Sequence, residues 1–317
     1  MIKEALEEAL NVRYVKLHFT VQMTEAAVLP VYKTSAIRGG MGQVLLDTNC
    51  IHIPQGDCDN CGFVRECMVH RTLYSEMDIR PGFMTTADSP GYILECEDYR
   101  EYFEEGDTFD FQLLLFGKTI VLFSQFINAL FALGERGLGK NRGRYAIAGL
   151  TGTFRDSILD REGFHMENFR IITLKEYTDY RLQKLKRQGA EDRELTIRFS
   201  SPLSMKVRGE EADRFSIQDV SVALIRRLYL LDCFEGIRMD QKDLYVDEFP
   251  EEIREEHRRV NVPRYSFHQQ RKMVMHGIEG KLVCSMPDEE LLKILLAGEI
   301  THLGKNTSFG FGRIHIK

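Results

Sequence analysis

The sequence predicts an α+β protein made of two tandem ferredoxin-like domains, and three observations support this fold class. A helix, a glycine-rich basic loop and a final strand occur near the middle of the chain and again at its C-terminus. The second half follows the order strand, helix, strand, strand, helix, strand, which is the ferredoxin-like order. The chain has 317 residues, which is room for two domains at roughly 150 residues each.

The first half opens with a strand over residues 12–23, because apolar and polar side chains alternate there. Pro30 ends this strand, and Ser35 is the expected N-cap of a short helix that runs towards Leu46. A second strand is predicted over 109–115, followed by a helix that ends at Gly134.

The second half supplies the matching elements: a strand at 194–199, a helix at 217–231, a hairpin at 265–286 with Gly277 and Gly280 near its turn, and a last helix capped by Asp288. We therefore place the first domain at 1–151 and the second at 193–317. Residues 152–192, which include a basic run, are predicted to connect them, and that run is either a solvated face or an RNA contact.

The composition of the chain excludes several classes of protein. Hydrophobic residues make up 43% of the chain and charged residues 28%, which excludes a disordered protein. The net charge is −6, so any nucleic acid must bind through local basic patches. The charged start of the chain and the use of cysteine indicate a reducing, cytoplasmic location. The most apolar window, 109–133, contains Asp110 and Lys118, so we expect no contact with a membrane.

The two glycine-rich loops share a motif: residues 138–141 and 303–306 both read Leu-Gly-Lys-Asn. A P-loop is rejected, because Asn141 stands where a Ser or Thr is needed and the loop follows a helix, so no nucleotide cofactor is expected. Glycines let a backbone approach phosphates, basic side chains neutralise them, and phenylalanines stack on bases. Alternatively, the glycines serve tight turns and the phenylalanines pack in the core. The predicted binding residues are Lys140, Arg142, Arg144, Gly304, Lys305, Phe309, Gly310, Gly312 and Arg313.

A Cys-rich insertion in the first domain, at about 47–75, carries four cysteines spaced C-x7-C-x2-C-x5-C: Cys50, Cys58, Cys61 and Cys67. Four thiolates complete a tetrahedron around zinc, and a structural zinc would stabilise a stretch with little core of its own. His52 or His70 would be able to replace one thiolate, and reduced cysteines packed in a small insertion are the alternative. Cys96, Cys233 and Cys284 are expected in the core.

These motifs carry a family resemblance. The segments are RYAIAGL after GLGKNRG, LTIRFSSPLSMK, RYSFHQQRKMVMHGIEG, GKNTSFGFGRIHI and SAIRGGMGQVL. With them the chain resembles the RAMP superfamily of CRISPR-associated proteins, and most closely the sixth Cas family, endoribonucleases that cut precursor CRISPR RNA within its repeats. The resemblance implies RAMP- or RRM-like domains and a role in antiviral defence. It also implies metal-independent cleavage by the ribose 2′-OH, which leaves a cyclic phosphate and a 5′-OH. The implied partners are CRISPR repeat RNA and, in an effector complex, other CRISPR subunits.

The family commonly places a catalytic His at its first helix, but this chain has none between Ser35 and Leu46. The catalytic candidates are therefore His52, Tyr32, Arg38 and His268, with Arg271 and Lys272 as further RNA contacts on the basic strand 264–272. His18 alternates with strand residues and is expected on a sheet surface. The missing His favours a competing class, a non-catalytic RAMP subunit that only holds guide RNA.

Overall fold

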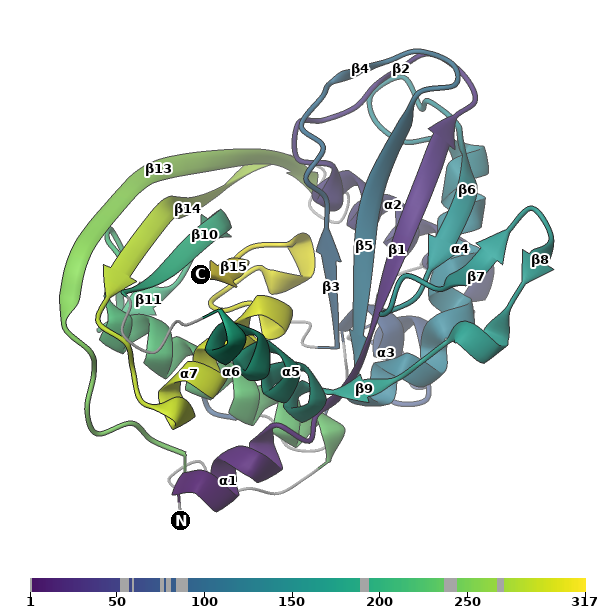
Figure 1. Ribbon diagram of the computed structural model, residues 1–317. Helices are drawn as coiled ribbons and strands as arrows, with labels where there is room; N and C mark the ends of the chain where they lie inside the picture. Colours follow the sequence, from purple (N-terminus) through teal and green to yellow (C-terminus); the bar gives the residue numbers. More distant parts are fainter. Residues whose placement is uncertain are drawn as a thin grey trace.

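Two antiparallel sheets form the frame of the protein (Figure 1). The structure, a computed structural model, describes residues 2–51, 57–58, 60–74, 77, 81–83, 91–188, 194–236, 244–266 and 271–317.

The sheet of the first half has the strand order β3-β5-β1-β6-β7-β8, with β9 paired to β1. Its strands are β1 (Arg13–Met23), β3 (Tyr92–Glu95), β5 (Thr108–Phe116), β6 (Tyr145–Thr151), β7 (Ser157–Asp160), β8 (Gly163–Phe164) and β9 (Ile172–Thr173). Helices α2 (Lys33–Asn49) and α4 (Phe123–Arg136) cover one face, because their apolar residues share a core with the inward residues of β1, such as Leu17 and Phe19.

The sheet of the second half has the order β13-β14-β10-β15. Its strands are β10 (Leu195–Leu203), β13 (Glu252–Ser266), β14 (Arg271–Cys284) and β15 (Ile314–Ile316), and its helices are α5 (Leu174–Arg187), α6 (Ile217–Glu235) and α7 (Glu289–Thr301). The order matches β3-β5-β1-β6 element for element, so both sheets contain the ferredoxin-like strand arrangement. The Asp288 carboxylate accepts the Leu291 N–H at 2.7 Å, which confirms the predicted cap of α7.

The remaining elements are short: α1 (Ile2–Ala9), α3 (Met68–Tyr74), β2 (Ala27–Val28), β4 (Tyr102–Phe103), β11 (Lys206–Val207), β12 (Glu210–Glu211), η1 (Gly117–Leu122), η2 (Met166–Asn168) and η4 (Thr307–Phe309). The two halves share one hydrophobic core. It joins Tyr14, Ile93 and Phe116 of the first sheet to residues of α6 and α7 such as Leu224 and Leu295. The second half therefore covers part of the face of the first sheet that α2 and α4 leave open.

Three predicted details are wrong. Helix α2 begins at Lys33 with Tyr32 at the N-cap, so Ser35 lies inside the first turn. The start is fixed earlier because the buried Lys33 ammonium donates to the backbone oxygens of Asp98 and Arg100. Helix α4 continues past Gly134, which packs against Tyr145, and ends at Arg136 with Gly137 as its C-cap.

The third error concerns the hairpin. Gly277 and Gly280 lie within β14 and not at its turn. At Gly280 the backbone has φ +153°, and a Cβ would stand 2.0 Å from the Glu256 oxygen of the neighbouring strand. Glycine is required there because two strands approach closely at a bend.

The segment 152–192 contains β7, β8, β9 and α5. Strands β7 and β8 extend the first sheet, whereas α5 packs beside α7 of the second half. The segment therefore contributes secondary structure to both halves.

Among the described residues, the stretch Gly117–Arg136 is long and apolar enough to span a membrane by length and composition alone. Half of it is buried inside the protein, where Phe126, Leu130 and Leu133 form part of the core. The apolar character of this stretch is explained by that packing.

Candidate nucleic-acid interface

The C-terminal glycine-rich loop, residues 304–313, docks on the first half of the chain (Figure 1). The Thr34 hydroxyl at the start of α2 donates to the Phe309 backbone oxygen at 2.8 Å. Gly310 has φ +82°, and a Cβ there would lie 2.5 Å from the Leu94 oxygen of β3. This loop is therefore held by α2 and β3 as well as by its own sheet.

A buried ionic network fixes the base of the same loop. Glu95, at the end of β3, contacts the His302 ring at 2.8 Å and the Lys16 ammonium at 2.7 Å, and the Arg313 guanidinium lies 3.6 Å away. Burial alone would raise the pKa of Glu95, but Lys16, His302 and Arg313 together hold it well below its usual value. The carboxylate stays ionised and joins β3 to the end of α7 and to β15.

Two arginines meet over one aromatic ring at this junction. The guanidinium carbon of Arg38, on α2, lies 4.4 Å from the centre of the Phe309 ring, and that of Arg264, on β13, lies 4.8 Å from it. Both distances are within the range of cation–π attraction. Three segments far apart in the sequence thus bring two positive charges to one place.

Neither arginine has an acidic partner among the described residues. The Nε atoms of Arg38 and Arg264 are buried and have no hydrogen-bond acceptor, and the Arg264 Nη2 reaches only the Met273 sulfur at 3.7 Å. Burial, and then the charge of Arg38, lower the pKa of Arg264. Two adjacent cations with unsatisfied donors form a site suited to an anion such as a phosphate.

Tyrosines and apolar residues complete the site. Tyr32 packs with Phe309, Phe311 and residues of the β13–β14 hairpin, and its ring lies edge-on to Tyr99 with centres 5.8 Å apart. Burial, and next the Glu279 carboxylate, raise the pKa of Tyr32. Its phenol therefore keeps its proton at neutral pH and acts as a hydrogen-bond donor.

The structure thus brings together Tyr32, Arg38 and Phe309 of the predicted residues. The other two catalytic candidates, His52 and His268, lie outside the described residues. The end of α2 that precedes His52 in the sequence lies far from Arg38. Cys50 is twelve residues beyond Arg38, at the far end of α2, which is about 18 Å along the helix axis.

Side chains alternate between the two faces of the β13–β14 hairpin, and this alternation separates the two predicted RNA contacts on β14. Arg264 pairs with Met273 in register, so Arg271, two residues from Met273, shares the face of the hairpin that carries Arg264. Lys272 belongs to the opposite face. Arg264 begins the basic strand 264–272 of the sequence prediction but was not among the predicted site residues, although its alternation with Val260 and Val262 was the available signal.

Other predicted residues of the C-terminal loop have structural partners. The Arg313 guanidinium forms an ion pair with Glu97 in addition to its contact with Glu95. A Cβ on Gly304 or Gly312 would lie 2.5 Å or 1.9 Å from a backbone oxygen of the chain itself. Lys305 has no ion pair among the described residues, and its N–H donates to the Ser204 oxygen at 2.7 Å.

The N-terminal loop docks elsewhere. The Asn141 side chain accepts from the Val28 N–H at 3.0 Å, which places this loop beside β2 (Figure 1). Lys140 and Arg142 are exposed, and Arg144 pairs with Glu25 at 3.0 Å. The structure therefore holds the two loops against different elements.

His18 lies in the middle of β1 and is buried, so the prediction that it lies on a sheet surface is wrong. Burial lowers the pKa of His18 to about 3, so the ring is neutral. The four cysteines Cys50, Cys58, Cys61 and Cys67 line one small cavity. Among the described residues, however, no three metal-ligating side chains stand close enough to hold an ion as they are placed.

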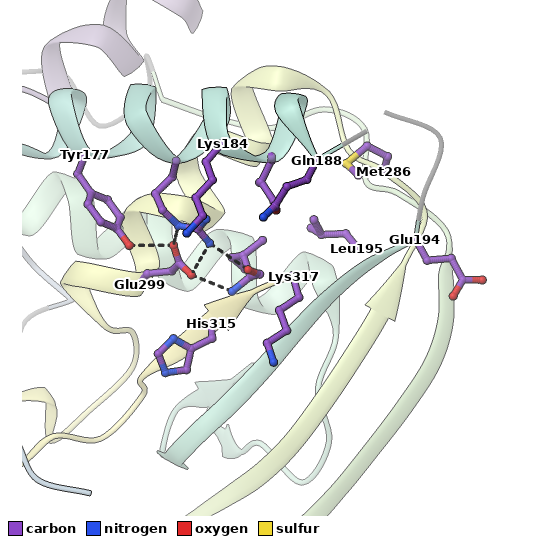
Figure 2. Close-up of a pocket in the computed structure, with 12 residues that line it drawn as sticks. Tyr177, Lys184, Gln188, Glu194, Leu195, Met286, Glu299, His315 and Lys317 are labelled. Carbon is purple, nitrogen blue, oxygen red and sulfur yellow. Dashed lines mark hydrogen bonds and ion pairs between the residues drawn. The ribbon is translucent and has the colours of Figure 1, made fainter. Parts of the chain in front are cut away.

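A cavity of about 620 Å³ lies between α5 and β15 (Figure 2). Glu299 accepts there from the Tyr177 hydroxyl, the Arg181 guanidinium and the Ile316 N–H at 2.7–2.9 Å. None of the predicted site residues that the structure describes lines this cavity. Its buried charges satisfy one another, so it is a poorer ligand site than the arginine pair.

Two family models match the chain in sequence: the AF_1859_N N-terminal domain over residues 10–167, and the CRISPR-associated endoribonuclease Cas6 over residues 197–314. No curated protein matches the chain significantly.

Solved structures share the fold at low sequence identity. A partial Cas6-RT-Cas1–Cas2 complex is 13% identical with a TM-score of 0.55, and the match covers 96% of this chain but only 46% of that one. A Thermus thermophilus Cas6 in a product complex is 15% identical with a TM-score of 0.51. The match covers 97% of this chain and 100% of that one. Together with the sequence match over 197–314, these folds confirm the predicted resemblance of the chain to the RAMP-type, CRISPR-associated endoribonuclease Cas6 family.

Proposed function

We propose that the protein is a cytoplasmic endoribonuclease that binds CRISPR repeat RNA and cuts it by attack of a ribose 2′-OH. The observation that carries this proposal is the pair of unpaired guanidinium groups, Arg38 and Arg264, over the Phe309 ring at the junction of the two halves. In this view the halves are two RAMP- or RRM-like domains, and residues 47–75 are an insertion in the first.

The two guanidinium groups would bind the phosphate that is cut. As the 2′-oxygen bonds to phosphorus, negative charge grows on the non-bridging oxygens, and fixed cations stabilise it. The bond from phosphorus to the 5′-oxygen then breaks. A general base takes the 2′ proton, a general acid protonates the leaving oxygen, and the products are a cyclic phosphate and a 5′-OH.

Tyr32 fits the role of the acid or of a donor to the phosphate, because its raised pKa keeps it protonated. For the base we favour His268 over His52. His268 is only four residues from Arg264 along the chain. His52 follows Cys50, at the end of α2 that lies opposite Arg38.

A second candidate function is a non-catalytic RAMP subunit that holds guide RNA. It is favoured by one observation: helix α2 contains no His. The two functions share the RNA site and differ only in whether the bound strand is cut.

The deciding experiment incubates the full chain with the repeat RNA of a CRISPR array from its own genome, in EDTA, beside the same RNA with one deoxyribose at the cut position. We expect cleavage of the first RNA and equal binding without cleavage of the second. Binding of both RNAs without any cleavage would establish the non-catalytic function. Cleavage of the deoxy substrate, or cleavage that EDTA stops at once, would refute the proposed chemistry.

A further inference from the structure

The cysteine cavity is built by three segments at the end of α2 that is remote from the arginine pair. Cys50 is the C-cap of α2, and its N–H donates to the Leu46 oxygen at 2.9 Å. Cys67 directly precedes α3, and its oxygen accepts the Arg71 N–H at 3.0 Å. Between them, Cys58 and Cys61 stand on a turn. All four line one cavity of about 20 Å³, which is the volume of one small ion or water.

Backbone hydrogen bonds explain why the cysteines converge. The N–H groups of Cys61, Val64 and Cys67 donate to the oxygens of Cys58, Cys61 and Val64, at 3.2–3.3 Å. Successive bonds over three residues eclipse side chains at that spacing. Cys58, Cys61, Val64 and Cys67 therefore share one side of the turn, and all four of these residues line the cavity.

The turn has no core of its own to hold it. None of the described residues between 57 and 68 is buried, and Phe63 is 62% exposed. An ordered stretch without buried apolar residues lacks the usual driving force for folding. A bound metal supplies that free energy in small domains whose ligands are cysteines.

We propose that Cys50, Cys58, Cys61 and Cys67 bind one structural zinc ion. The ion would tie the C-terminal end of α2 to the turn and to α3. Because the four thiols surround the cavity without yet standing at ligand distance, zinc must draw the sulfur atoms together, and binding is coupled to local ordering. Four thiolates leave no open position on the ion, so the site is structural and takes no part in RNA cleavage.

Elemental analysis of the full chain, purified without added metal, is expected to give one zinc per chain. After removal of zinc, cobalt(II) is expected to give the absorption bands of a tetrahedral thiolate complex. Iodoacetamide should label the four cysteines several times faster after chelation than before. Cys96 and Cys284 are internal controls, because burial raises the pKa of each thiol to about 11 and keeps both unreactive in either state.

The matched variants are Cys61→Ser, which removes one ligand, and Cys233→Ser, which changes a cysteine packed beside Leu230 and Phe234 on α6. We expect Cys61→Ser to lose zinc and Cys233→Ser to retain it. If Cys61→Ser does not fold, the cobalt titration of the parent protein decides whether the four thiolates bind a metal ion. A folded parent without zinc, without thiolate bands and with unchanged labelling would overturn the proposal, and so would iron in the site.

Discussion

The glycines of the two Leu-Gly-Lys-Asn loops have the same backbone conformation in both halves of the molecule. Gly139 and Gly304 have φ values of +80° and +79°, and Leu138 and Leu303 are both buried. A Cβ on either glycine would stand 2.5 Å from a backbone oxygen, that of Val28 in the first half and that of Ser204 in the second. Both oxygens belong to the segment directly after the first long strand of their half, β1 or β10.

The shared motif is therefore explained by the packing of each half on itself. The two loops differ in the residues after the motif. Only the C-terminal loop continues into Phe309, Gly310 and Phe311, and only this loop docks on the other half and contacts Arg38 and Arg264. The repeated motif thus marks a repeated fold, whereas the candidate site is made by residues that are not repeated.

The contrast between the two loops is tested most strongly by removing one cation of the arginine pair. Arg264→Ala, or Arg38→Ala, should lower the single-turnover cleavage rate at saturating protein by about 100- to 1000-fold, because one stabilising charge on the transition state is lost. Arg142→Ala removes an exposed cation of the N-terminal loop and should leave the rate within a few-fold. A loss for Arg142→Ala as large as that for Arg264→Ala would contradict the distinction.

The docking of the C-terminal loop is tested by Glu95→Gln. Because the carboxylate is buried among Lys16, His302 and Arg313, we expect a loss of about 3 kcal/mol in the free energy of unfolding, measured with urea. Glu25→Gln, at the exposed pair with Arg144, is the matched control and should change little.

The same carboxylate makes stability depend on pH. The pKa of Glu95 is lowered on folding, so its contribution is fully present above the unfolded value of about 4.5 and is lost as the pH falls below it. The difference between parent and Glu95→Gln should therefore shrink between pH 5 and pH 3. A difference that is constant over this range would show that Glu95 acts only through packing.

A smaller effect is expected at Phe309. Replacing it by Leu removes the ring over which both guanidinium groups lie. Because a cation–π contact contributes about 0.5–2 kcal/mol, repeat RNA should bind roughly 5-fold more weakly. Phe309→Tyr retains the ring and should bind like the parent.

The smallest expected effect is a change in the salt dependence of RNA binding, which distinguishes two cations of the C-terminal loop. Lys305→Ala should reduce the slope of log K against log salt by about 0.7 if the RNA there is single-stranded. Arg313→Ala should leave the slope unchanged, because this side chain already pairs with Glu95 and Glu97. The same slope change for both variants would mean that Arg313 leaves its carboxylates to bind RNA.

Much of the fold was accessible from the sequence because it depends on local periodicity. The alternation of Val15, Leu17 and Phe19 predicted β1, and the cap at Asp288 predicted α7. Errors arose where a distant contact overrode a local signal. Lys33, held by Asp98 and Arg100, starts α2 two residues before Ser35.

Within the candidate site, the amino-acid sequence was enough to establish which chemical groups are present: basic loops, Tyr32 and Arg38 at the start of a helix, and four cysteines at metal-ligand spacing. Which of these groups meet depends on long-range packing. Arg38, Arg264 and Phe309 are separated by 45 to 271 positions, and no periodicity links them. Their junction exists because the second half docks on α2 and β3 through Thr34 and Glu95. That docking leaves two guanidinium groups beside one ring, with no carboxylate partner in the part of the chain that the structure describes.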